Sequence, residues 1–460
     1  MKPAFLFVNI AALFLMQVAH AADSGSDARQ FWPQWRGPLA TGSAPLAAPP
    51  VEWSETKNVK WKVKLPGFGT STPIIWGDRV FVLTAVPGRK NVETKASETP
   101  AATPATSPNP AEGRQPGGGG FGRSEKPTEP YQFKVLCLDR NTGKILWQKV
   151  AREEVPHEGH HKDHGFASAS PVTDGKHLFA YFGSHGLYCF DLEGNLKWEK
   201  DFGDMQTKNS FGEGSSPALF GNTVVIVWDH EGDDFIVALD KTTGKELWRG
   251  TRNEDTGWST PLVVENGGKP QVVVNATHKV RSYDLTTGQQ LWECAGQTAN
   301  AIPSPVATAD TVYVTSGFRG SALFALRLDH TGDLAGTDAV RWSYNKNTPY
   351  VPSPLLVNNA LYLVTGNNGT LSCFDAKSGQ ANFEGERLEG IFGIYASPVA
   401  AKDHVYVLGR EGTCLVLKQG TQLEILATNK LDDKTDASLA LAGNDLFLRG
   451  HQNLYCISAK

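Results

Sequence analysis

The chain consists of short runs of β-branched and aromatic residues that alternate with polar turns rich in Gly, Asn and Asp. Residues 310–314 (DTVYV) and 359–363 (NALYL) are two examples in which a turn residue leads directly into such a run. β-Branched and aromatic side chains favour strands, and polar residues between two short apolar runs indicate a hairpin. The pattern therefore predicts an all-β protein made of hairpins.

These runs belong to a unit that repeats about every 40 to 50 residues, which is the period of propeller blades. Each unit begins with Ser or Thr, then Pro, then an apolar strand. Proline is tolerated at the first residue of a strand because no ladder hydrogen bond is lost there. The prolines are Pro73, Pro171, Pro217, Pro261, Pro305, Pro354 and Pro398, and Ser438-Leu439 is an eighth copy without proline.

A second repeated mark is the string D-x-x-T-G-K-x-x-W. It occurs at residues 139–147 and 240–248, at 284–292 with Gln in place of Lys, and more loosely at 191–198 and 375–383. The Asp side chain can bond the turn backbone, and Gly supplies a positive φ. The Trp ring is a large apolar surface that we expect to pack against the neighbouring blade.

Both marks give eight copies when Trp61, in the N-terminal run 59–63 (VKWKV), is counted among the Trp strands. The two counts are out of phase, because the first strand has a Trp but no preceding repeat, while the last repeat ends without a Trp strand. We therefore predict an eight-bladed β-propeller of four-stranded antiparallel blades. The Trp61 strand completes the last blade, so that the ring has no open edge.

Outside the repeats the chain divides into three further segments. Residues 1–21 have a basic start, an apolar stretch and an Ala-x-Ala end, which predict a cleaved signal peptide. Residues 22–52 form a leader segment ahead of the propeller, which spans 53–460. The propeller contains a Pro-, Gly-, Ala- and Thr-rich insertion at about 88–130, whose composition predicts disorder.

Charge and hydropathy exclude two classes of partner. The formal net charge of −4 leaves no basic surplus for nucleic acid, and the one long apolar run lies in the predicted signal. No cysteine precedes Cys137, so a lipid-anchoring cysteine is missing as well. We expect a periplasmic or secreted monomer without a transmembrane segment or lipid anchor.

The six cysteines are predicted to be buried thiols rather than disulfides. Cys137, Cys189, Cys373 and Cys456 occupy the same place in different repeats, and equivalent repeat positions lie a blade apart. There is no C-x-x-C motif and no adjacent Cys-Cys pair. Thiol redox chemistry therefore has no support.

The unusual polar residues are predicted to gather on one face of the ring. In a four-stranded blade, the loop after the second strand and the connection into the next blade lie on one face, which we call the long-loop face. The tight turns lie on the other, the tight-turn face. The long loops contain residues 157–164, 209–215, 229–234, 253–258, 317–320, 344–350 and 409–412.

The candidate site residues come from these loops. His157, His160, His161 and His164 could bind zinc, copper or nickel, although a solvated loop without fixed spacing is the simpler interpretation. The acidic string 229–234 alternates oxygen ligands but lacks the glycine that a calcium loop needs. The remaining candidates for ligand contact are Glu213, Asp229, His230, Glu231, Trp258, Arg319, Tyr350, Tyr395, Arg410 and Arg449. The three arginines occupy like places and could grip an anion, or they could pair with acidic neighbours such as Glu411.

The Ser-Pro strands and T-G-K-x-x-W strings resemble those of the PQQ-like β-propeller repeat family, over residues 53–460. That family includes BamB-like outer-membrane protein assembly factors, and its fold is shared by quinoprotein alcohol dehydrogenases. In those dehydrogenases the central channel holds the quinone, with calcium, a base and usually an adjacent-cysteine disulfide. This chain lacks that disulfide, and no complete motif for PQQ or a divalent metal is present.

We find no G-x-S-x-G, P-loop or H-E-x-x-H motif, so a catalytic constellation has no basis in the sequence. The favoured hypothesis is a non-enzymatic binding or scaffold module, with a protein or polysaccharide ligand at the long-loop face. The alternatives are a quinone- or metal-dependent oxidoreductase and a BamB-like assembly factor, which would add strand-like partners at the rim.

Overall fold

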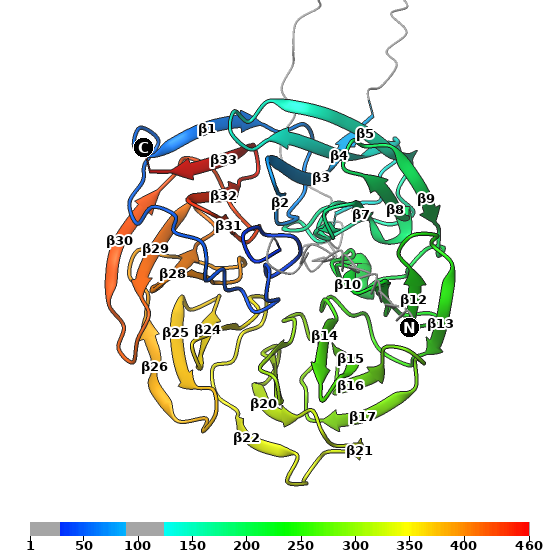
Figure 1. The fold of residues 1–460 in the computed structure, drawn as a ribbon, viewed down its shortest axis with the longest axis vertical. Coiled ribbons are helices and arrows are strands. Elements are labelled where there is room, and N and C mark those ends of the chain that lie inside the picture. The colour runs from blue at the N-terminus through cyan, green and yellow to red at the C-terminus, as the bar shows by residue number, and fades with distance from the viewer. Residues whose placement is uncertain (1–27, 89–123, 460) are drawn as a thin grey trace, which may run out of the picture.

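Eight antiparallel β-sheets surround a central axis in the computed structural model, which describes residues 28–88 and 124–459 (Figure 1). The predicted signal peptide and most of the predicted insertion at about 88–130 lie outside the described residues. No helix within the described ranges is long and apolar enough to cross a membrane. The eight-bladed, all-β prediction is confirmed.

Each blade is a four-stranded antiparallel sheet. The blades are numbered in the order in which their innermost strands follow one another along the chain. Blades 1 to 4 comprise β2 (Ile74–Trp76), β3 (Arg79–Pro87), β4 (Tyr131–Asp139), β5 (Ile145–Glu154); β6 (Val172–Thr173), β7 (His177–Tyr181), β8 (Leu187–Asp191), β9 (Leu196–Lys200); β10 (Ala218–Phe220), β11 (Thr223–Trp228), β12 (Phe235–Asp240), β13 (Glu246–Thr251); and β14 (Leu262–Asn266), β15 (Lys269–Asn275), β16 (Lys279–Asp284), β17 (Gln290–Ala295). Short 3₁₀ turns η1 (Gly183–His185) and η2 (Lys208–Ser210) lie in the long loops.

Blades 5 to 8 continue the ring, and the first strand of the chain belongs to the last blade. They comprise β18 (Val306–Ala307), β19 (Thr311–Ser316), β20 (Ala322–Arg327), β22 (Val340–Tyr344); β23 (Leu355–Val357), β24 (Ala360–Thr365), β25 (Thr370–Asp375), β26 (Ala381–Arg387); β27 (Val399–Ala401), β28 (His404–Leu408), β29 (Thr413–Lys418), β30 (Ile425–Lys430); and β31 (Ala440–Ala442), β32 (Asp445–Arg449), β33 (Asn453–Ser458), β1 (Val59–Lys64). A two-residue strand, β21 (Gly332–Asp333), adds to the outer edge of β17.

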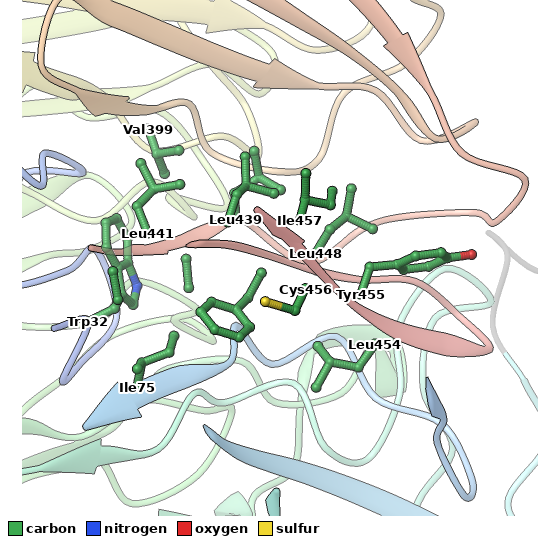
Figure 2. Packing of buried hydrophobic residues seen from close by; sticks show 14 of the residues in the cluster. Trp32, Ile75, Val399, Leu439, Leu441, Leu448, Leu454, Tyr455, Cys456 and Ile457 are labelled. Atoms are coloured by element: carbon green, nitrogen blue, oxygen red, sulfur yellow. The ribbon is translucent and has the colours of Figure 1, made fainter. Parts of the chain in front are cut away.

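The ring closes as the sequence predicts. Strand β1 pairs antiparallel with β33, and Trp61 lies opposite Cys456. Figure 2 shows the apolar core around this junction, where Leu448, Cys456 and Ile457 of blade 8 face a cluster that also holds Trp32 and Ile75. All six cysteines are buried free thiols, so the disulfide reading is excluded.

The repeated Trp packs onto the turn of the next blade. The indole Nε1 of Trp248 in β13 donates a hydrogen bond of 2.7 Å to the carbonyl of Leu285. Its ring lies so close to Gly288 that a Cβ there would sit 2.5 Å from it. Equivalent Trp–Gly contacts join Trp61 to Gly143, Trp147 to Gly194, Trp198 to Gly244 and Trp342 to Gly379. The predicted role of the Trp and Gly positions is therefore confirmed at five junctions.

The Ser or Thr that precedes each opening proline has a role that the sequence did not reveal. Its hydroxyl accepts a hydrogen bond from the backbone N–H of the equivalent residue one blade earlier. Seven such bonds of 2.9–3.1 Å run around the axis, and the accepting residues, which we call the hydroxyl collar, are Ser170, Ser216, Thr260, Ser304, Ser353, Ser397 and Ser438. At the closing junction the series is interrupted, because Thr72 Oγ1 is buried without a partner among the described residues.

The described part of the leader, residues 28–52, packs against the innermost strands on the tight-turn face. Trp32 forms a bridge with Ile75, and Ser43 forms one with Ala400. The buried Arg36 Nη2 donates 2.7 and 2.9 Å hydrogen bonds to the carbonyls of Pro354 and Pro398, in different blades. The leader, dark blue in Figure 1, thus crosses the centre of the ring.

Candidate functional site

The central channel holds a cavity of about 640 Å³ that faces the long loops. All seven members of the hydroxyl collar line it, together with side chains from nine connections between strands. Trp35, from the leader on the opposite side, also lines the cavity and donates a 3.1 Å hydrogen bond from Nε1 to Ser304 Oγ. The cavity is therefore a cup with Trp35 at its floor and the long loops at its mouth.

The four histidines of the loop 157–164 do not converge on one point. His157 Nε2 lies 2.6 Å from the Met205 carbonyl, and His160 Nδ1 lies 2.7 Å from the His161 carbonyl. Only His161 and His164 line the central cavity. His164 Nδ1 lies 2.9 Å from Ser168 Oγ, and burial lowers the pKa of His164 to about 4, so its imidazole is neutral near pH 7. Within residues 28–88 and 124–459, no group of three or more His, Cys, Asp or Glu side chains is arranged to hold a metal ion.

The same loop is tied to the far side of the mouth by Arg410. Its Nη2 lies 3.0 Å from Asp163 Oδ1, and its Nε lies 2.6 Å from Asp436 Oδ1. The guanidinium also lies 4.0 Å from the ring centroid of Tyr395. Burial alone would raise the pKa of the Asp163 and Asp436 carboxyls. The hydrogen bonds and charge of Arg410 outweigh burial and lower both pKa values, and at Asp436 a hydrogen bond from His451 adds to this effect. Arg410 thus pairs with acidic neighbours, but Glu411, the neighbour named as an example, is not one of them, because its carboxylate lies 3.9 Å from Lys434 Nζ.

The three like-placed arginines have three different environments. Arg319 is exposed and lines the cavity, with its guanidinium 5.2 Å from the ring centroid of Phe318. Arg410 belongs to the ion pairs described above. Arg449 is buried at the closing junction, where it donates to Ser71, and burial lowers its pKa to about 9. The alternative of a triple grip on an anion is therefore not formed, because each loop directs its arginine to a different place.

Aromatic side chains form much of the cavity wall. Phe318 stacks on Tyr350 with a centroid distance of 4.9 Å and an interplanar angle of 27°. Trp258 lines the wall from the connection between blades 3 and 4, and its Nε1 donates a 2.7 Å hydrogen bond to the Gly212 carbonyl. Tyr395 lines the cavity beside Arg410. Trp258, Tyr350 and Tyr395, three of the sequence candidates, are thus brought to one cavity.

Side chains of the acidic string 229–234 bond to other groups of the protein. Asp229 accepts hydrogen bonds of 2.6 and 2.9 Å from the buried Arg252. His230 Nδ1 accepts the Gln206 backbone N–H at 3.1 Å, and Glu231 Oε1 accepts the Thr256 hydroxyl at 2.8 Å. These side chains join blades 2, 3 and 4 at the mouth. Asp229, His230 and Glu231 do not line the central cavity.

Glu213 lies beside a separate cavity of about 30 Å³ between blades 2 and 3. Its carboxylate accepts hydrogen bonds from the Ser184 backbone N–H at 2.7 Å and from the Ser184 hydroxyl at 2.5 Å. Burial raises the pKa of Glu213, against the opposing charge of His185. His157 and Tyr181 line the same small cavity, so Glu213 is part of the inter-blade packing rather than of the central cup.

Sequence reasoning missed several residues of the cup. Trp35 stands in the string 32–38 (WPQWRGP), which ends before the repeats begin, so no periodicity points to it. The collar hydroxyls were visible as the residues before the opening prolines. Their shared position in the repeats marks them as equivalent, but only the closed ring shows that all seven face one cavity.

Comparison with known proteins places this fold among two kinds of propeller. A family model described as outer membrane protein assembly factor BamB matches residues 132–384 and 277–460, whereas no curated protein matches the chain. BamB from Moraxella catarrhalis superposes with a TM-score of 0.54 at 14% identity, covering 71% of this chain and 93% of that one. The quinohemoprotein alcohol dehydrogenase from Comamonas testosteroni gives 0.59 at 10% identity, covering 95% and 82%. A europium-containing methanol dehydrogenase gives 0.58 at 10% identity, covering 92% and 90%. At such identities these structures share the fold alone.

The donor set of the cup does not fit a metal–quinone centre. Asp163 and Asp436 are the carboxylates that line it, and both are bonded to Arg410. Hard cations such as Ca²⁺ take six to eight oxygen ligands, of which carboxylates are the principal charged ones. Both carboxylates are already paired with a guanidinium, so neither is free to act as a ligand for such an ion.

Proposed function

We propose, from the premise that the chain belongs to the family of the outer membrane protein assembly factor BamB, that it is a binding module whose ligand enters the central cup from the long-loop face. The observation that carries this proposal is the cavity of about 640 Å³, closed below by Trp35 and walled by aromatic rings. Binding pockets for small ligands have volumes of about 300 to 1,000 Å³ and combine apolar walls with a few polar groups. The predicted signal peptide supports a periplasmic location for this activity.

A cavity-filling substitution tests this function without disturbing the blades. Ala299 lines the cup, and Ala381 is an exposed residue on the outer strand β26. The experiment incubates the protein with a small-molecule extract of its own cell envelope and records native mass spectra. We expect a retained ligand mass with the wild type and with Ala381→Trp, and its loss with Ala299→Trp. Equal retention by both variants, or no retained mass with any of the three, would contradict the proposal.

The family match also supports a second candidate, an outer-membrane assembly role in which a partner contacts the rim. The outermost strands of blades 1, 2 and 3 carry exposed Leu146, Leu196 and Leu247, which are 48%, 50% and 51% exposed. An exposed outer strand can accept another chain by β-addition. Crosslinking in intact envelopes from a residue on β5 would capture assembly machinery under this hypothesis. Capture from the cup mouth instead would favour the first proposal.

The quinone- or metal-dependent oxidoreductase receives less support. The similarity to alcohol and methanol dehydrogenases is one of fold, and the cup lacks the free carboxylates that a calcium-bound quinone requires. We therefore place the binding role ahead of it.

A further inference from the structure

The cup has an excess of hydrogen-bond donors. Each collar hydroxyl accepts a backbone N–H from the preceding blade, so one of its lone pairs is used while its own proton remains to be donated. No described protein group accepts a hydrogen bond from any of the seven collar hydroxyls. All seven line the cavity. A ligand in the cup therefore meets a ring of O–H donors and must bring acceptor oxygens.

One cationic side chain at the cavity wall can meet an anion. Asp163 and Asp436 are both paired with Arg410, and Lys208 lies 3.0 Å from Asp255. Arg319, by contrast, makes no ion pair or hydrogen bond with any side chain in the described ranges, and it lies at the cavity wall. It is the cation available for a ligand, and a guanidinium binds carboxylate and sulfate oxygens through two parallel hydrogen bonds.

The aromatic walls restrict the class of anion. The stacked Phe318–Tyr350 pair, Trp258 and the floor residue Trp35 come from different loops around the cavity. A sugar ring matches this surface, because its C–H faces pack on aromatic rings and its oxygens project around its edge toward donors. Polypeptide anions lack this ring of oxygens.

We propose that the cup binds the acidic sugars of an oligosaccharide, with Arg319 on the carboxylate or sulfate and the hydroxyl collar on the ring oxygens. This inference rests on the proposed binding function and names its ligand class. Trp35 acts as the floor that limits how far a sugar chain can enter. The carboxylate of a uronate and the sulfate ester of a sulfated sugar share the chemistry that Arg319 recognises.

Isothermal titration with four probes tests the proposal: a galacturonic acid tetramer, a heparin-derived tetrasaccharide, maltotetraose and tetraglutamate. We expect binding of at least one acidic oligosaccharide, with affinity at least tenfold above that of neutral maltotetraose and of tetraglutamate. The variant Arg319→Gln should lower the affinity for the acidic sugar about tenfold or more, the effect of losing one charge-assisted pair. The matched control is Arg387→Gln, because Arg387 is an exposed arginine whose guanidinium lies 5.9 Å from the Phe392 ring, outside the cup.

Three outcomes would overturn the inference. They are equal binding of maltotetraose or tetraglutamate, an Arg319→Gln affinity equal to that of Arg387→Gln, and no binding of any probe. If these occur while Ala299→Trp still abolishes retention of the extracted ligand, the cup binds something other than an acidic sugar and the proposed function stands. If Ala299→Trp has no effect either, both proposals fail. Unfolding midpoints of the two arginine variants, measured in parallel, separate a binding defect from a folding defect.

Discussion

The two faces of the propeller are built from the same blades but use their residues in opposite ways. On the tight-turn face one solution recurs, with an Asp that accepts turn N–H groups, as Asp139, Asp240 and Asp284 do. On the long-loop face no two loops are alike, and even the like-placed Arg319 and Arg410 have different partners. Repetition therefore identifies residues that hold blades together. The long loops differ from blade to blade, so they can recognise a particular ligand.

The largest effect we expect is the loss of a repeated Trp. Trp248→Ala removes the ring packed on Gly288 and the 2.7 Å hydrogen bond to Leu285. Trp→Ala substitutions at packed positions cost about 3 to 5 kcal/mol, so we expect the free energy of unfolding to fall by about 4 kcal/mol. Chemical denaturation measures it. The neighbouring Leu247 is 51% exposed, and Leu247→Ala should change stability by less than about 0.5 kcal/mol. Similar losses in the two variants would remove the structural distinction that we draw from the repeats.

A second substitution isolates the close approach beneath that Trp. Gly288 has a φ of +74° and a Trp248 ring atom 2.5 Å from where a Cβ would stand, whereas Gly268 has a φ of +78° and no atom within 4 Å of that point. Gly268→Ala should cost only the left-handed conformation, about 1 kcal/mol. Gly288→Ala should cost about 3 kcal/mol, because overpacking adds to the conformational term. The difference between the two unfolding free energies measures the contact, and equal values would show that the turn relaxes at no cost.

The same contrast explains what the sequence could reveal. Local patterns that repeat predict the number of blades, the closing strand with Trp61, the buried cysteines and the Trp–Gly junctions. Because each pattern recurs, the role of one copy indicates the role of the others. The exception is Trp292, whose Nε1 donates to Gln271 Oε1 at 2.9 Å instead of to a following turn. Blade 5 has a longer connection there, containing β21, and replaces the usual turn with a strand added to β17.

The mouth and the floor of the cup could not be predicted in the same way. Asp163, Arg410 and Asp436 lie in three different loops, and Asp163 is far from the other two in the chain, so the three meet only in the closed ring. Trp35 reaches the cavity from a leader outside every repeat. Such contacts depend on where whole blades place their loops, and a repeat period carries no information about them.

The long-loop face should lose stability in mild acid. Burial lowers the pKa of His164 to about 4, below the usual value of 6.5, so between these pH values the unfolded chain binds a proton that the folded protein excludes. Its contribution is complete above pH 6.5 and decreases as the pH falls toward 4. The shift corresponds to about 2 kcal/mol lost between pH 7 and pH 5.

Denaturation at both pH values checks this prediction with matched variants. His164→Asn should reduce the loss between pH 7 and pH 5 by about 2 kcal/mol, whereas Asn at the exposed His278 should leave it as in the wild type. An identical pH dependence in the two variants would mean that His164 takes up its proton in the folded state. The mouth of the cup would then be more hydrated than its packing indicates.

The smallest effect is expected at a single repeated turn. Asp240 Oδ1 accepts the backbone N–H of Thr242 at 3.1 Å and that of Thr243 at 2.8 Å, and the bonds to Thr243 lower the pKa of Asp240. Asp240→Ala should therefore lower the free energy of unfolding by about 1 kcal/mol near neutral pH. Because a lowered carboxyl pKa stabilises the fold only above the unfolded value, near 4, this difference should shrink below that pH, a window that does not overlap the one for His164. Ala in place of the exposed Asp233 on the long-loop face is the control, and a cost equal to that of Asp240→Ala would show that the repeated turn is no more structural than an unrepeated loop.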